Sequence, residues 1–398
     1  MNRVETKHTY NVSTSHRLIG KIKGSKPGPT VVFFAGIHGN ESAGVQALTK
    51  VFSNVMEGDI TGTMYGIAGN IPALQKGQRY LDEDLNRIWT KERIEALPNK
   101  DDRSIEDQEQ LNILKILNEI LTGHEDPLYF IDFHTTSSKT LPFITINDAL
   151  INRNFSRYFP VPIVLGIEEY LHGPLLSYIN ELGYVSLGFE SGQHDDHQAV
   201  LNSVSFAYLT MVFSGLISKD ALPGFTAHYN RLKSESNGLS ELFEVVYLYR
   251  IKPDESFKMK DGFDSFQDVK KHNIIATSND LPIRPKYNAK IFMPLYQSKG
   301  QEGFFMIKRI PRFIVKLSVY LRRFKADNIL ALLPGISWAN KKKHTLLVDL
   351  NTTRFFAKPL FHLLGYRNKQ VDETHLKLNN RERASKVEIY KNEWWYKK

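Results

Sequence analysis

The sequence predicts an α/β protein built on a mixed sheet, followed by a smaller β-rich domain. In the first half, short apolar runs of strand length alternate with amphipathic segments of helix length, as in a sheet covered by helices. A polar, turn-prone stretch at 234–240 interrupts this pattern, and strand-like runs with Gly-containing turns follow it. The chain has 398 residues, enough for two domains, which we place at 1–236 and 237–398.

Four apolar runs of the first half are predicted strands. TVVFFA at 30–35 consists mainly of β-branched and aromatic residues, the pattern of a strand buried on both faces. The runs at 129–133 and 184–189 are of the same kind, and the second ends at Glu190. A shorter run covers 143–146.

Two helices are predicted between these strands. One begins near 40–42, because apolar residues recur at helical spacing beyond it. The other covers 104–121, with Ser104 as N-cap and Asp107 at the capping-box position. In the second half we predict strands at 243–251, 289–292 and 345–350, and a basic amphipathic segment at 311–324.

Composition restricts the chemistry and the compartment. The chain has no cysteine, so disulfides and thiolate ligands are excluded and any metal must be held by His, Asp or Glu. The first fifteen residues lack the apolar core of a secretory signal, and no run reaches the roughly 18 apolar residues of a membrane span. We therefore expect a cytoplasmic protein without a membrane partner.

The positive charge is concentrated at one end of the chain. The formal net charge is +9, but residues 306–398 hold 21 Lys and Arg against 7 Asp and Glu, a net +14 that leaves −5 for residues 1–305. A nucleic acid or anionic membrane would have to bind this basic end. We favour solvated faces and a packed tail, and expect no nucleic-acid partner. The candidates for anion binding are Lys341 to Lys343, Arg322, Arg323, Trp394 and Trp395.

Two short segments have the composition of a metal site. In GIHGNE at 36–41, His38 and Glu41 are close enough in sequence to reach one ion, and the glycines beside His38 allow a tight path from strand to helix. In IDFH at 131–134, Asp132 and His134 face the same way along a strand, so Asp132 can orient His134. Two histidines, one glutamate and an open position are typical of catalytic zinc.

Two further segments supply groups for catalysis. RYLDEDLNR at 79–87 has two arginines and an asparagine that could hold a carboxylate and polarise a carbonyl. GFESGQH at 188–194 places Glu190 at the end of a strand, where a general base is expected. Each of these four segments alone would more often be structural or form a solvated loop. Their occurrence together, in the order that one mechanism needs, favours a catalytic site.

These segments resemble the succinylglutamate desuccinylase/aspartoacylase family, a branch of the zinc carboxypeptidase superfamily. The matching text is GIHGNE (36–41), RYLDEDLNR (79–87), IDFHTTSS (131–138) and GFESGQH (188–194). The resemblance is strong over about 30–200, weaker to about 306, and absent beyond 310. It implies an α/β/α zinc-carboxypeptidase-like catalytic domain and a β-rich C-terminal domain with a basic extension.

The resemblance also implies roles for seven residues. One zinc ion per chain would be bound by His38, Glu41 and His134, and Glu190 would move a proton from the attacking water to the leaving amine. Arg79 would steady the oxyanion, while Asn86 and Arg87 would hold the carboxylate and acyl groups of a small N-acyl substrate. The protein could also form a homo-oligomer, which the sequence does not decide.

Two departures bear on the substrate. The aspartoacylase branch has a carboxylate-binding arginine about ten residues before the catalytic glutamate, where this chain has Asn180. Its C-terminal tyrosine falls near Phe304 or Phe305, so that hydroxyl is missing. We therefore expect a substrate other than N-acetylaspartate or a close dicarboxylate analogue.

Three functions remain in competition. We favour an amide hydrolase that removes the acyl group of an N-acyl amino acid or a similar small amine. A carboxypeptidase-like enzyme acting on short peptides is the alternative within enzymes, and a C-terminal domain that caps the site would disfavour it. The third is a protein that binds nucleic acid or a membrane surface through its basic end.

Overall fold

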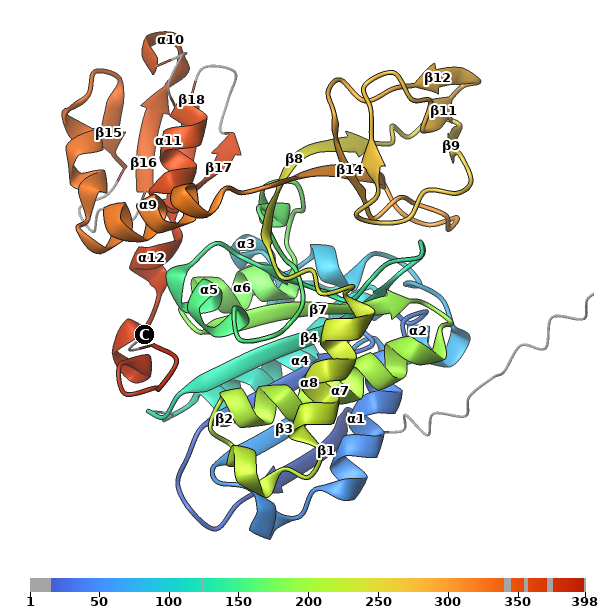
Figure 1. Ribbon diagram of the computed structural model, residues 1–398, viewed down its shortest axis with the longest axis vertical. Coiled ribbons are helices and arrows are strands. Elements are labelled where there is room, and N and C mark those ends of the chain that lie inside the picture. The colour runs from blue at the N-terminus through green and yellow to red at the C-terminus, as the bar shows by residue number, and fades with distance from the viewer. Residues whose placement is uncertain (1–15, 124, 340–344, 354–356, 371–374, 397–398) are drawn as a thin grey trace, which may run out of the picture.

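A computed structural model describes residues 16–396 except 124, 340–344, 354–356 and 371–374. Within these residues, one eleven-stranded mixed sheet runs through the molecule (Figure 1). Strands β3, β2, β4 and β7 are parallel neighbours at its centre, and β1 and β5 add to them antiparallel. In spatial order the strands are β1 (Leu18–Lys23), β3 (Thr63–Ala68), β2 (Thr30–Ala35), β4 (Leu128–Thr136), β7 (Val185–Gln193), β5 (Phe143–Ile146), β6 (Ile163–Leu165), β8 (Leu242–Arg250), β14 (Glu302–Arg309), β13 (Ala289–Phe292) and β10 (Asp268–Val269).

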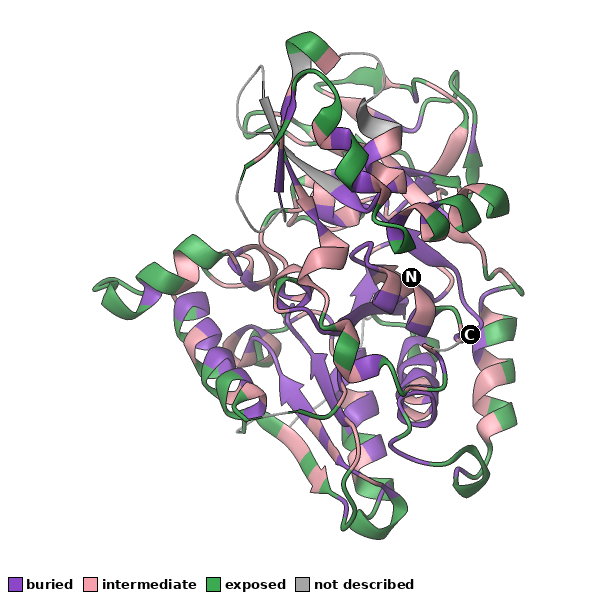
Figure 2. Ribbon diagram, turned by 90° about the vertical axis from the view of Figure 1, so that its left-hand side faces the viewer, coloured by how far each residue is buried: buried purple, intermediate pink, exposed green. Residues whose placement is uncertain are grey.

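The central strands are buried on both faces, as their apolar runs predict. Every residue of β2 is buried, and its side chains alternate between two cores. Phe33 packs in the core beneath α1, α7 and α8, whereas Phe34 packs in the core beneath α4 and α6. The result is the predicted α/β/α arrangement, with buried strands enclosed by partly exposed helices (Figure 2).

The helices follow the predictions closely. Ser104 caps α4 and forms a capping box with Asp107, as predicted. The first predicted helix begins at Ala43, with Ser42 as its N-cap, so His38 and Glu41 lie in the loop before it. The helices of this part are α1 (Ala43–Asn54), α2 (Ile71–Lys76), α3 (Lys91–Ala96), α4 (Ile105–Leu121), α5 (Leu150–Ser156), α6 (Leu175–Glu181), α7 (His197–Phe213) and α8 (Phe225–Glu235), with short 3₁₀ turns such as η2 (Leu85–Arg87) and η4 (Ile167–Glu169).

The sheet continues across the predicted boundary into the second half. After the stretch 234–240, β8 pairs parallel with β6, and β14 pairs with β8, so two long strands extend from the first part of the molecule into a β-rich lobe (Figure 1). These strands confirm the prediction at 243–251, and β13 is the strand predicted at 289–292. The division at 237 itself stays a prediction. A small antiparallel sheet completes the lobe, with β12 (Leu281–Ile283), β11 (Ala276–Ser278) and β9 (Phe257–Met259).

Beyond β14 the chain forms a further lobe with its own apolar core. The segment predicted at 311–324 is the helix α9 (Arg312–Arg323), and the strand predicted at 345–350 is β16 (Thr345–Asp349). Leu346, Val348 and Tyr366 are buried in the centre of this lobe. Its other elements are η6 (Ala326–Leu332), β15 (Ile336–Trp338), α10 (Leu350–Thr353), α11 (Ala357–Leu363), β17 (Tyr366–Gln370) and β18 (His375–Asn380).

The chain then returns to the first part of the molecule through α12 (Arg381–Ala384) and η7 (Val387–Tyr390). Trp395 is fully buried against Tyr129 and Phe155, so the aromatic tail packs in the main core. Arg322 is also buried, 2.8 Å from both Asp148 and Glu382. Two candidates for anion binding thus have structural roles, and Lys341 to Lys343 lie outside the described residues, as do residues 1–15.

No helix in the described part of the chain has the length and apolarity needed to cross a membrane.

Candidate active site

The first site loop joins β2 to α1 and depends on two glycines. Gly36 has a positive φ of 71°, which favours glycine. A β-carbon at Gly39 would overlap backbone atoms of Ala73 and Gln78. The loop can therefore turn tightly at the end of β2, and it places His38 and Glu41 beside the end of β4.

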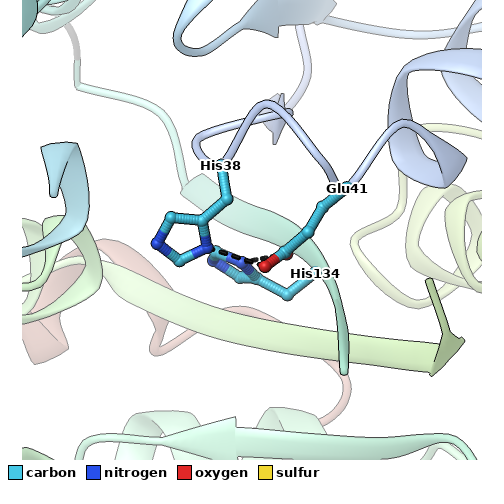
Figure 3. Close-up of side chains that lie close together, drawn as sticks. All are labelled: His38, Glu41 and His134. Carbon is cyan, nitrogen blue, oxygen red and sulfur yellow. Dashed lines mark hydrogen bonds and ion pairs between the residues drawn. The ribbon is translucent and has the colours of Figure 1, made fainter. Parts of the chain in front are cut away.

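Three side chains converge at this point (Figure 3). His38 Nδ1 lies 2.8 Å from Glu41 Oε1, and His134 Nδ1 lies 2.9 Å from Glu41 Oε2. One ligand atom from each residue lies within 4.8 Å of the others, and all three residues are buried. Two imidazole nitrogens and a carboxylate are suitable donors for a zinc ion.

The outer nitrogen of each imidazole faces a carboxylate. His38 Nε2 lies 3.0 Å from Asp84 Oδ1, and His134 Nε2 lies 2.8 Å from Asp132 Oδ2. A carboxylate accepts a hydrogen bond, so it favours the tautomer that carries its proton on Nε2 and leaves the Nδ1 lone pair for the centre of the cluster. Asp132 was predicted in this position. Asp84 was not, although it belongs to the segment 79–87 that the sequence singled out.

The electrostatics of the cluster favour a cation. Burial acts to raise the pKa of Glu41, but the charges of His38 and His134 outweigh it and hold this pKa well below its ordinary value. Burial likewise acts to lower the pKa of His134, but Asp132 and Glu41 raise it well above the ordinary range. In the metal-free protein, a proton on His134 thus helps to balance the carboxylates beside it, and a metal ion would take its place.

Glu190 lies on β7, directly beside His134 in the register of the sheet. Its side chain is 7% exposed, and its Oε2 atom has no hydrogen-bond partner within the described residues. Burial raises the pKa of Glu190 to about 8. Glu190 and the three cluster residues line one cavity. The sequence predicted a strand that ends at Glu190, but β7 continues to Gln193 because it pairs with β4 as far as Thr136.

The predicted arginines and asparagine reach the same cavity. Arg79 donates to Asp84 Oδ2 from Nε at 3.2 Å and from Nη2 at 3.0 Å, and its Nη1 lies 3.5 Å from Glu41. Asn86 accepts a hydrogen bond from the backbone N–H of Leu175. Arg87 Nη2 donates to Glu302 Oε1 at 3.1 Å. The structure therefore brings together all seven residues that the sequence selected.

Two cavity residues were not assigned a role from the sequence. His194 Nδ1 lies 2.8 Å from Thr135 Oγ1, and its Nε2 lies 3.1 Å from Gln297 Oε1. Burial lowers the pKa of His194. His194 ends the motif GFESGQH and could have been found there. Gln297 comes from a loop more than one hundred residues away, and no sequence signal pointed to it.

The β-rich lobe closes one side of the cavity. Met293, Gln297 and Glu302 line the cavity, although they are about one hundred residues or more beyond the other site residues in the sequence. Phe305 also lines the cavity, whereas Phe304 packs between Tyr247 and Tyr249 on the other side of β14. Asn180 is 1% exposed on α6 and does not line the cavity. The position that we aligned with a carboxylate-binding arginine therefore lies outside the site.

The fold and the site together describe a mixed-sheet α/β/α protein with a smaller β-rich part and a cluster of side chains that could hold a metal ion. Residues 27–201 match the model of the succinylglutamate desuccinylase/aspartoacylase catalytic domain. This match is to the family that the motifs of the sequence resemble.

Solved structures are similar in fold. A solved succinylglutamate desuccinylase/aspartoacylase from Rhodobacter sphaeroides is similar in fold, with a TM-score of 0.56 and 15% identity over 73% of this chain and 88% of that one. The ectoine utilization protein EutE (DoeB) from Ruegeria pomeroyi has a TM-score of 0.53, with 16% identity over 73% of this chain and 87% of that one.

Similarity in sequence is more local. A succinylglutamate desuccinylase from Yersinia pseudotuberculosis is 31% identical over 108 residues, which are 27% of this chain and 32% of that protein. The chain thus spans about a third of the length of the curated relatives it matches.

Proposed function

We propose that this protein is a zinc-dependent amide hydrolase that removes the acyl group from an N-acyl amino acid or a similar small N-acylated amine. The observation that carries the proposal is the convergence of His38, Glu41 and His134 with the buried carboxyl group of Glu190 in one cavity. A metal-ligand set next to a carboxyl group of raised pKa is the arrangement that amide hydrolysis by water requires.

The residues present fit a metal ion. The three donors are preformed, and carboxylates hold the outer nitrogens of both histidines. His38 Nδ1, Glu41 and His134 Nδ1 would be the ligands. When bound, zinc would lower the pKa of a coordinated water to about 7 and polarise the scissile carbonyl.

The remaining steps are proton transfer and charge stabilisation by the chain itself. Burial raises the pKa of Glu190 to about 8 in the metal-free protein, and a bound cation would lower it, so that Glu190 could accept a proton near neutral pH and then donate it to the leaving amine. Arg79 lies at the same end of the cavity, fixed by Asp84, where its guanidinium would stabilise the developing oxyanion. Asn86 and Arg87 line the wall nearby and would hold the substrate.

The closed side of the cavity favours a small substrate over a peptide. Residues of the β-rich lobe, among them Met293 and Phe305, form part of the wall. A long peptide would have to pass them, whereas a single N-acyl amino acid need not. This observation supports the deacylase over the carboxypeptidase-like alternative.

The metal is tested first. Purified protein should hold about one zinc per chain, and His38→Ala and His134→Ala should each lose it. His272→Ala is the matched control, because His272 is an exposed histidine of the β-rich lobe and should leave zinc content unchanged. If native protein holds no transition metal and takes up no added zinc, the proposal is wrong.

The chemistry is tested next with a screen of N-acyl amino acids and short peptides that detects newly freed amine. Glu190→Ala should keep the zinc and lose hydrolysis, because it removes the base and no metal ligand. Retained activity would remove Glu190 from this role, and cleavage of peptides in preference to N-acyl amino acids would favour the alternative.

A further inference from the structure

The cavity has two chemically different sides. Near the metal ligands it is polar, with Arg79, Glu190 and His194. Six apolar side chains that we call the apolar wall also line it: Ile146, Ile167, Leu171, Leu176, Met293 and Phe305, with the polar Thr145 and Asn147 on either side of Ile146 in the sequence. The wall comes from β5, η4 and the residues after it, α6, and the β-rich lobe, so distant parts of the chain contribute to one apolar surface.

The cationic groups of the cavity are few and already paired. Arg79 and Arg87 are the Lys or Arg side chains among the described residues that line it. Arg79 is bound to Asp84 on the metal side, where it is placed for the oxyanion. Arg87 is 3.1 Å from Glu302 and is the one guanidinium left to meet a substrate carboxylate.

A second carboxylate would find no partner on the apolar wall. Asn180 lies outside the cavity, so α6 brings no charged or amide group in its place. Glu168 lines the cavity as well, and its carboxyl group is not a cationic partner for a second carboxylate. A charged group placed against apolar side chains without a partner loses its hydration, whereas an alkyl or aromatic group gains by leaving water.

We infer that the substrate carries a single carboxylate and an apolar substituent that occupies the apolar wall, rather than the second carboxylate of a dicarboxylic substrate. The inference rests on the proposed deacylase function and specifies its substrate class. The apolar substituent could belong to the amine side or to the acyl side of the amide, and the two are separated by experiment.

The test uses zinc-loaded full-length protein and two matched pairs of substrates. N-Acetylleucine and N-acetylaspartate differ on the amine side, and N-hexanoylglycine and N-succinylglycine differ on the acyl side. In at least one pair, kcat/KM for the apolar member should exceed that of the acidic member by about 10-fold or more. The pair that shows the difference identifies the side that meets the wall. Equal or higher kcat/KM for the acidic member in both pairs overturns the inference.

Variants of Leu171 test the wall itself. Leu171 is partly buried in the loop after η4, so Leu171→Arg should place a cation on the wall and move the preference toward the acidic member. Leu171→Ala, a milder change, should lower kcat/KM for the apolar member and leave the acidic one unchanged. Leu332→Arg is the matched control, since Leu332 is 81% exposed on η6. If neither Leu171 variant alters the preference, the wall does not contact the substrate.

Binding separates this inference from the proposed function. Glu190→Gln protein, which lacks the base, is titrated with the same four compounds by calorimetry. If native protein hydrolyses none of them but the apolar members bind Glu190→Gln more tightly, the deacylase proposal fails and the ligand class stands. Equal or tighter binding of the acidic members, or no binding of any compound, overturns the inference.

Discussion

Asp84 connects the metal cluster to the proposed oxyanion group, so Asp84→Asn should weaken zinc binding without removing a ligand. One carboxylate oxygen accepts from His38 Nε2 at 3.0 Å, and the other accepts from Arg79 Nε and Nη2. An amide has one acceptor and one donor. Whichever way the new amide turned, an N–H group would face either His38 or Arg79, and the negative charge between them would be lost.

The expected size follows from this contact. Removing a carboxylate that orients a metal-bound histidine typically costs 10–100-fold in metal affinity, which corresponds to about 1.4–2.7 kcal/mol. His38→Ala should cost more, because it removes the ligand. Zinc affinity is measured by competition with a chromophoric chelator, and thermal unfolding of the metal-free proteins shows whether the fold is intact.

Asp82→Asn is the control for this prediction. Asp82 belongs to the same loop, but its carboxylate is exposed and accepts from the backbone N–H of Ile105, away from both histidines. It should bind zinc like the native protein. If Asp84→Asn also binds zinc within about twofold of native protein while His38→Ala does not, then the carboxylate does not orient His38 and the reasoning is refuted.

Three further predictions concern the fold, the base and the oxyanion. Trp395→Ala should lower the free energy of unfolding by about 3–5 kcal/mol, because Trp395 is fully buried. Trp394→Ala should cost less, about 1–2 kcal/mol, because Trp394 is 41% exposed and loses a hydrogen bond to the Phe213 carbonyl and a ring contact with Tyr158; urea unfolding that shows equal losses would contradict this. The protonated carboxyl group of Glu190 gives an infrared band that is identified by its absence in Glu190→Gln, and in metal-free protein this band should titrate near pH 8. Zinc should lower the midpoint of this titration, because a cation favours the carboxylate. A midpoint near 4.5 in metal-free protein would show that burial does not raise the pKa of Glu190. Arg79→Gln should lower kcat by about 10²–10³-fold with little change in KM, and a change in KM alone would assign Arg79 to substrate binding instead.

The central fold could be predicted from the sequence because its signals are local. β2 is a short run of mainly β-branched and aromatic residues and β4 begins with the apolar run LYFI, and the side chains of β2 alternate between two cores as a strand buried on both faces must. Ser104 and Asp107 form the expected capping box, since the two residues lie within one helical turn. Local chemistry of this kind does not depend on the rest of the chain.

The site was predictable where several groups lie in one motif. His38 with Glu41, and Asp132 with His134, are neighbours in sequence and stay neighbours in space. Gln297 and Glu302 reach the cavity through the long strands β8 and β14, and pairing between strands so distant in sequence leaves no local pattern. Asn180, which we aligned with a carboxylate-binding position, is buried on α6 and does not line the cavity, and no local pattern in the sequence indicates this.

The basic end of the chain shows why net charge is a poor guide to function. Arg322 counts toward the +14 of residues 306–398, yet its guanidinium is fully buried and is bound by Asp148 and Glu382. A charge removed from water in this way is stable only with partners of opposite sign, so it is unavailable to a phosphate or a lipid. Asp148 directly follows Asn147, which lines the cavity. Arg322 therefore ties the lobe of α9 to the wall of the proposed active site, and its charge serves a contact within the molecule.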